Sequence, residues 1–233
     1  MLSSIKLYTH HFLHLFFPHT CIACGSDNLN SSDVLCLQCL HKLPETNFFS
    51  QPNNPVEKTF YGRLNIHAAA AGYYFTKDAL IQHLMVELKY KKNKKAGYFL
   101  GRMIGLMMQQ SNRFNTIDFL VPLPLNPKKE VQRGYNQSTI ICDGIASVIH
   151  KPILTKTVIR THFTATQTKQ NRIHRWQNME NAFAITNTNV LEGKHILLVD
   201  DVVTTGATLE ACGNAILAIG NTQLSIATVA YTI

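Results

Sequence analysis

The sequence predicts an α/β fold in which helices cover a mostly parallel sheet, with a small cysteine-rich module at the N-terminus. From residue 66 onward, short apolar runs alternate with longer helical patterns, an order typical of parallel sheets buried on both faces. Before that point, four of the six cysteines fall into two close pairs. The 233 residues suffice for one medium domain and a small appendage.

Residues 1–17 are expected to form a short amphipathic helix. The segment mixes Leu and Phe with three histidines and a single Lys, and it lacks the apolar core and small-residue cleavage site of a signal peptide. No apolar run in the chain approaches the roughly 20 residues of a membrane span. We therefore expect a cytoplasmic protein without a membrane span.

The two cysteine pairs, Cys21/Cys24 and Cys36/Cys39, have the spacing of a four-thiolate zinc site. Each C-x-x-C turn allows two sulfurs to reach one tetrahedral ion. The alternatives are two disulfides or buried free thiols, and a reducing cytoplasm disfavours the disulfides. A closed four-sulfur site leaves no position for water, so the expected zinc is structural and not catalytic.

Residues 44–60 are rich in Pro and Asn and are interpreted as a linker. We expect the N-terminal helix and zinc module over 1–50, the linker over 51–65, and the larger domain over 66–233. Within that domain the apolar runs predict strands over 68–75, 119–122, 195–199 and 224–231. The helical patterns predict helices over 79–88, 97–110, 138–149 and 209–219.

The most informative segment follows the apolar run that begins at Ile196. It delivers two adjacent carboxylates, Asp200 and Asp201, and then a small hydroxyl-rich loop in which Gly206 precedes a helix. Backbone amides and threonine hydroxyls at the positive end of a helix can bind a phosphate. Paired carboxylates can accept hydrogen bonds from vicinal ribose hydroxyls, directly or with a metal ion nearby.

Three other interpretations of an apolar strand followed by two acids were weighed. A Walker-type ATPase requires G-x-x-x-x-G-K-[ST], which the chain lacks, because Gly193-Lys194 is followed by His195. A receiver domain requires a phosphorylatable Asp well downstream, and no acid follows Glu210. The remaining alternative is a helix cap with structural acids.

The segment Leu198–Thr208 resembles the phosphoribosyl pyrophosphate signature of type I phosphoribosyltransferases. Together with the cysteine module, Val121–Pro124 and Arg133–Gln137, it makes most of the chain resemble the competence-protein ComF family (ComFC and GntX-like proteins). The later part of that pattern comprises Arg160, Gln167, Arg175, Asn178, Ala182 and Phe183. The chain departs from the family at Gln170, where an apolar residue is usual, and at Asn181, where glycine is frequent.

This resemblance implies a type I phosphoribosyltransferase-like sheet that binds phosphoribosyl pyrophosphate with Mg²⁺. It implies that Asp200 and Asp201 hold the ribose hydroxyls, and that Arg175 lies in a loop that closes over the substrate. It also implies a part in natural transformation, with DNA-uptake proteins as partners. Whether transfer is catalysed, and to which acceptor, stays open. The implied contacts to the 5′-phosphate are Val203, Thr204, Thr205, Gly206, Ala207 and Thr208, and those near the pyrophosphate are Lys89, Pro122 and Arg133.

The formal net charge of +8 is concentrated in the middle of the chain. Residues 61–115 hold nine basic and two acidic residues, whereas residues 176–233 hold one basic and five acidic. Five lysines and Tyr90 lie within residues 89–95, a composition that suits the backbone and bases of single-stranded DNA. A non-catalytic single-stranded DNA-binding accessory is therefore the alternative function, and a solvated helix end is the plain alternative for the lysines.

Overall fold

The computed structural model describes residues 19–30, 33–76, 79–161 and 182–233. The chain divides into two compact units, Met1–Leu43 and Pro44–Ile233. The predicted helix over 1–17 lies outside the described residues. Among those that are described, no helix combines the length and the apolar character needed to cross a membrane.

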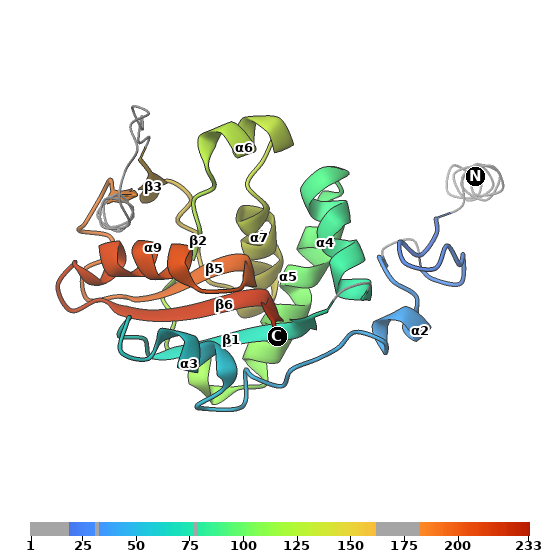
Figure 1. Cartoon of the computed structure of the whole chain (residues 1–233), viewed down its shortest axis with the longest axis horizontal. Helices are drawn as coiled ribbons and strands as arrows, with labels where there is room; N and C mark the ends of the chain where they lie inside the picture. Colours follow the sequence, from blue (N-terminus) through green and yellow to red (C-terminus); the bar gives the residue numbers. More distant parts are fainter. Residues whose placement is uncertain (1–18, 31–32, 77–78, 162–181) are drawn as a thin grey trace, which may run out of the picture. The chain divides into compact units, whose positions relative to one another are not determined.

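A four-stranded parallel sheet forms the centre of the larger unit, in the order β1-β6-β5-β2 (Figure 1). Its strands are β1 (Ala68–Phe75), β2 (Phe119–Pro122), β5 (His195–Val203) and β6 (Gln223–Thr232). All four predicted strands are confirmed. β5 runs four residues further than expected and carries the acid pair within it.

Helices pack against this sheet, as the sequence predicted. They are α4 (Leu80–Tyr90), α5 (Lys94–Gln109), α7 (Gln137–Ile149) and α9 (Ala207–Leu217). Two glycines allow α5 and α7 to approach closely, because a Cβ on Gly101 would lie 2.1 Å from the Ile141 carbonyl oxygen and one on Gly144 would lie 2.2 Å from that of Tyr98. The core between helices and sheet is apolar and contains Leu100, Ile104, Ile141, Ile145, Leu197 and Ile226, all fully buried.

The segment expected to be a linker over 51–65 contains a helix, α3 (Pro55–Phe60), whose Val56 and Phe60 are fully buried. Asn54 caps it by accepting hydrogen bonds from the Val56 and Glu57 amides. Glu57 pairs with Arg113 and accepts a hydrogen bond from the Ala69 amide. The division at residue 43/44 therefore places this segment in the larger unit.

Shorter elements complete the described chain. The cysteine module holds α2 (Leu37–Leu40), and a 3-10 turn, η1 (Asn112–Phe114), precedes β2. Helix α6 (Pro127–Arg133) has no buried residue and stands away from the sheet at the top of Figure 1. An antiparallel pair joins β3 (Val158–Arg160) to β4 (Phe183–Ile185). The sequence patterns did not predict these five elements, because each is too short to show a clear period.

Candidate functional site

The acid pair lies near the C-terminal end of strand β5, where it contacts one side chain from each of two other elements. Ser138, in the first turn of α7, donates a hydrogen bond from Oγ to Asp200 Oδ1 at 3.0 Å. Lys89, near the end of α4, places Nζ 2.9 Å from Asp201 Oδ2. The structure therefore brings together two acids adjacent in the chain with a lysine and a serine that are distant from them in sequence.

Asp201 is the more enclosed of the two acids, with 6% of its surface exposed. Its Oδ2 is buried, and its one partner among the described residues is the Lys89 ammonium, with which it forms an ion pair. A ligand that brings a hydroxyl donor or a cation would therefore compete with Lys89 for this oxygen.

Burial first, and then the neighbouring Asp201 carboxylate, raise the pKa of Asp200 to about 7. The Asp201 backbone, Ser138 and Lys89 act in the opposite direction. Near neutral pH Asp200 is therefore close to the midpoint of its titration. Titratable groups with such shifted pKa values are frequent at binding and catalytic sites.

The loop after the acid pair is fixed by two neighbours. Gly206 has a φ of +72°, and a Cβ there would lie 2.8 Å from the Phe60 ring, so glycine suits both the backbone and the space. Arg63 donates a hydrogen bond to the Thr205 carbonyl at 3.0 Å and pairs with Glu210. Sequence reasoning missed Arg63, because nothing local links it to the loop.

The loop leads directly into α9, whose N-cap residue Gly206 provides no side-chain acceptor. The Ala207 amide has only a long contact of 3.5 Å to Thr205 Oγ1. A shallow hollow of about 60 Å³ over this turn is lined by Asp200 and by Val202 through Leu209. Exposed amides at a helix N-terminus, together with threonine hydroxyls, form a phosphate-sized site.

In the smaller unit, the four cysteine sulfurs lie within 4.8 Å of one another, positioned for one metal ion. All four are free thiols, so the disulfide alternative is not what the structure shows. Burial and the surrounding thiols raise the pKa of Cys39 to about 12. Burial also opposes ionisation of Cys21, but backbone amides, that of Cys36 foremost, lower its pKa to about 6. Four sulfurs in contact can all ionise only with a cation among them.

Comparison with known proteins identifies both the domain and the relatives of the chain. Residues 138–232 match the phosphoribosyl transferase domain. Competence protein F of Haemophilus influenzae is 23% identical over 222 residues, covering 91% of this chain and 96% of that protein. Competence protein ComFC of Bacillus subtilis is 33% identical over 98 residues, covering 42% and 38%.

The chain is similar to the competence proteins of the ComF family.

A further relative is the DNA utilization protein YhgH of Escherichia coli, 30% identical over 146 residues. That match covers 61% of the chain and 63% of YhgH, less than two thirds of the relative. Among solved structures, glutamine phosphoribosylpyrophosphate amidotransferase of B. subtilis, complexed with ADP and GMP, has a TM-score of 0.43 and 20% identity. It covers 59% of this chain and 26% of that one.

The remaining predicted site residues are spread around the acid pair. Pro122 pairs with Val199 in the sheet and so lies one residue from the acids. Arg133, at the end of α6, donates a hydrogen bond to Gln137 and lies 5.7 Å from the centre of the Tyr90 ring. Arg175 lies outside the described residues, so its predicted catalytic part is not addressed by the structure.

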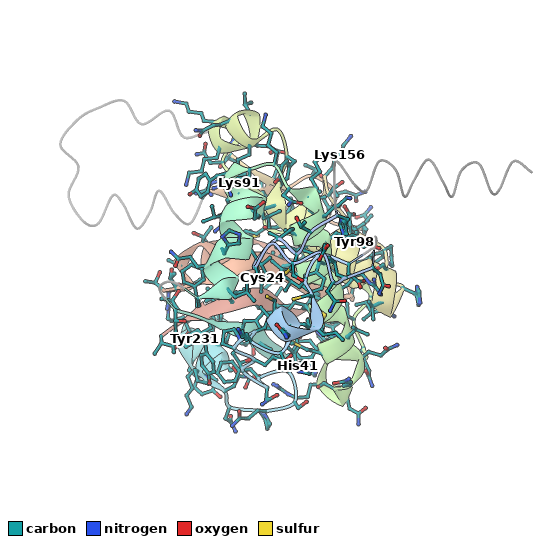
Figure 2. The ribbon with its side chains drawn as sticks, turned by 90° about the vertical axis from the view of Figure 1, so that its right-hand side faces the viewer. Cys24, His41, Lys91, Tyr98, Lys156 and Tyr231 are labelled. Atoms are coloured by element: carbon teal, nitrogen blue, oxygen red, sulfur yellow. The ribbon has the colours of Figure 1, made fainter. Side chains whose placement is uncertain are left out.

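Two cavities flank these residues. The smaller, about 270 Å³, lies between α4 and α6 and is lined by Lys89, Tyr90, Lys92, Lys129, Gln132 and Arg133. Figure 2 labels Lys91, which lies between Tyr90 and Lys92 in the chain, in the upper part of the view. The larger, about 560 Å³, lies between the turn after β2 and strand β3. Sequence reasoning did not identify the larger cavity, because its walls come from four separate segments.

Proposed function

We propose that this protein binds phosphoribosyl pyrophosphate with Mg²⁺ through the acid pair and the threonine loop. The observation that carries the proposal is the position of two adjacent carboxylates, one of them ion-paired with Lys89, beside the hollow over the threonine loop. A ribose diol donates hydrogen bonds in pairs, and the two adjacent carboxylates offer acceptors for both hydroxyls. The 5′-phosphate would then meet the exposed amides of α9 and the hydroxyls of Thr204, Thr205 and Thr208.

The charges around the acids fit the rest of this ligand. Lys89 connects the acid pair to the cavity between α4 and α6, where Lys92, Lys129 and Arg133 add three more positive charges. Among the described residues, neither Lys92 nor Lys129 forms an ion pair with an acid. Such a cavity can hold the pyrophosphate end of the ligand.

The donor set also fits Mg²⁺. This ion prefers carboxylate and phosphate oxygens, and the acid pair lies next to the proposed pyrophosphate position. Bound there, Mg²⁺ would neutralise the pyrophosphate as it leaves. From the protein, Asp200 and Asp201 would orient the ribose, and Lys89 would balance the charge of the acids until ligand arrives.

The experiment is isothermal titration calorimetry with phosphoribosyl pyrophosphate, with and without Mg²⁺. We expect binding by the wild type and loss of most affinity in Asp200→Ala/Asp201→Ala. Phosphate affinity should persist in part, because the loop is intact. Glu192→Gln, which changes an exposed acid in the turn before β5, is the matched control. No binding by the wild type would overturn the proposal.

In the smaller unit we propose a structural zinc ion on Cys21, Cys24, Cys36 and Cys39. The mutual proximity of the four free thiols supports it. The proposal places the protein in the cytoplasm, where thiols remain reduced. Metal analysis of purified protein should give about one zinc per chain, and a protein that folds fully without metal would contradict the assignment.

The cavity between α4 and α6 also favours a second function, binding of single-stranded DNA. Tyr90 is 71% exposed beside four cations, which is the combination that stacks bases and follows a phosphate backbone. The names of the relatives, competence and DNA utilization proteins, agree with this function. On this proposal the protein serves natural transformation, with DNA-uptake proteins as partners.

Fluorescence anisotropy with a labelled oligonucleotide across a salt series tests it. Affinity should fall steeply with salt, by about 0.7 in log K per log salt for each phosphate contacted. Tyr90→Ala should weaken binding by roughly fivefold or more, since stacking contributes about 1–3 kcal/mol per base. Tyr98→Ala, which removes another exposed tyrosine, is the control. A flat salt response would contradict DNA binding.

A further inference from the structure

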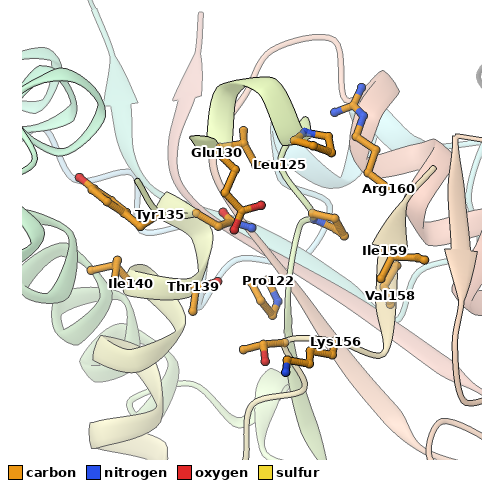
Figure 3. A pocket seen from close by; sticks show the side chains of 14 residues that line it. Pro122, Leu125, Glu130, Tyr135, Thr139, Ile140, Lys156, Val158, Ile159 and Arg160 are labelled. Atoms are coloured by element: carbon orange, nitrogen blue, oxygen red, sulfur yellow. The ribbon is translucent and has the colours of Figure 1, made fainter. Parts of the chain in front are cut away.

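The larger cavity is a groove at the outer edge of β2 (Figure 3). Tyr135, Thr139 and Ile140 lie on one side, and Val158, Ile159 and Arg160 lie on the other, with Pro122 between them. Glu130 of α6 turns toward the groove from above in that view. A volume of about 560 Å³ falls within the range of small-molecule sites and is much larger than a single nucleobase needs.

The groove shares a wall with the proposed ribose site. Pro122 pairs with Val199, the residue before Asp200. On α7, Thr139 lines the groove and directly follows Ser138, which holds Asp200. Asn136 also lines it and donates from Nδ2 to the Leu123 carbonyl, which fixes the turn after β2. A ligand in the groove would therefore lie beside the ribose and not at a remote surface.

Along β2, this edge leaves one backbone acceptor, the Pro122 carbonyl, and no backbone donor. The Leu120 amide donates to the Pro152 carbonyl and the Leu120 carbonyl accepts from the Leu154 amide, so the N–H and C=O of this residue both point away from β5. Residues of a parallel strand alternate between their two neighbours, so Pro122 also faces outward, but proline has no N–H. The Leu123 amide faces inward, to the Val199 carbonyl. Together with the Glu130 carboxylate, this edge favours a ligand that brings its own N–H donors.

The other wall of the groove supplies positive charge. Lys156 and Arg160 line it, and neither forms an ion pair with an acid within the part of the chain that the structure describes. Between these polar groups most of the lining is apolar, including three prolines, Leu125, Ile140, Val158 and Ile159. The apolar lining and the Glu130 carboxylate disfavour a pyrophosphate in this groove. A flat heterocycle with N–H groups and an anionic substituent fits the acceptors with its N–H groups, the apolar lining with its ring, and the two cations with its anionic group.

We propose that the groove binds the acceptor of the phosphoribosyl group, and that this acceptor is of nucleotide size: a planar nitrogen heterocycle carrying a phosphate. The inference rests on the proposed binding of phosphoribosyl pyrophosphate. In the transfer, a ring nitrogen forms the bond to C1 of the ribose while the bond from C1 to the pyrophosphate oxygen breaks. Pyrophosphate leaves with the electron pair, and the proton of the nitrogen passes to water.

The test uses the full chain, first saturated with phosphoribosyl pyrophosphate and Mg²⁺ so that the threonine loop is occupied. GMP and UMP, whose rings keep an N–H, are then titrated, with guanine and uracil as their free-base probes, and pyrophosphate release is followed in parallel. We expect at least one mononucleotide to bind about tenfold more tightly than its free base, because the phosphate gains charge-assisted hydrogen bonds.

Variants separate this groove from other anion sites. Arg160→Gln and Lys156→Gln should each weaken nucleotide binding about tenfold, whereas Lys194→Gln, an exposed lysine at the start of β5, should not. Thr139→Phe fills the groove, and Ser147→Phe on the exposed side of the same helix is its control. Equal binding of bases and nucleotides, or nucleotide binding unaffected in Arg160→Gln and Lys156→Gln, would overturn the inference. Failure of the first saturation step would instead count against the proposed function.

Discussion

Replacing Asp200 with Asn should stabilise the ligand-free protein at high pH while removing its affinity for ribose. Burial and Asp201 raise the pKa of Asp200 from 3.8 to about 7. The folded protein therefore holds this proton more tightly than the unfolded chain does. The free energy of unfolding must then fall as pH rises from about 4 to about 7, because the unfolded chain releases the proton first.

The size of the effect follows from the two pKa values. Each unit is worth ~1.36 kcal/mol, so a fully ionised Asp200 destabilises the folded state by roughly 4 kcal/mol at pH 8. At pH 5 the penalty is only about 1–2 kcal/mol, since the folded protein is still protonated there. Asn keeps the shape and can still accept the Ser138 hydrogen bond, so it removes mainly the charge.

Urea unfolding of wild type and Asp200→Asn at pH 5, 6.5 and 8 measures this difference. The stability gained by the variant should grow by about 2–3 kcal/mol between pH 5 and pH 8. Glu192→Gln should change the free energy of unfolding by less than about 0.5 kcal/mol at every pH. A gain that is constant with pH, or that shrinks as pH rises, would refute the reasoning about a buried acid pair.

Three further predictions follow from single contacts. Gly206→Ala should lower the free energy of unfolding by more than about 1 kcal/mol and weaken binding of phosphoribosyl pyrophosphate, because φ is +72° and the Phe60 ring fills the space. Urea unfolding measures the first effect and calorimetry the second, and an unchanged unfolding midpoint would contradict the prediction. Glu57→Ala should lower the free energy of unfolding by about 3 kcal/mol or more, because it removes the acidic partner of Arg113 and the acceptor of the Ala69 amide, whereas the exposed Glu192→Ala should lower it little in the same unfolding series. Metal analysis should find no bound zinc in Cys39→Ser, whereas Cys212→Ser, which changes a buried thiol of the larger unit, should keep its zinc. Zinc retained in Cys39→Ser would argue against a four-sulfur site.

Features whose signal lies within a few neighbouring residues could be predicted from the sequence. The four strands of the sheet and its main helices follow from apolar period, and the cysteine pairs and the acid-plus-threonine segment follow from spacing. Helix α3 could not be predicted, because a run rich in Pro and Asn is also what a linker contains. Its helix depends on the burial of Val56 and Phe60 and on the pairing of Glu57 with Arg113, which are contacts with other elements.

The sequence by itself determined the fold class, the place of the acid pair and the set of possible metal ligands, because these depend on the order of residues along one segment. Only the tertiary structure decided which distant side chains meet the acids. Lys89 contacts Asp201, Ser138 contacts Asp200, and Arg63 holds the loop at Thr205. It also decided that Arg160 and Pro122 line the same groove. Such contacts arise from strand order and helix packing, which bring separate segments to one edge of the sheet, and no local pattern records them.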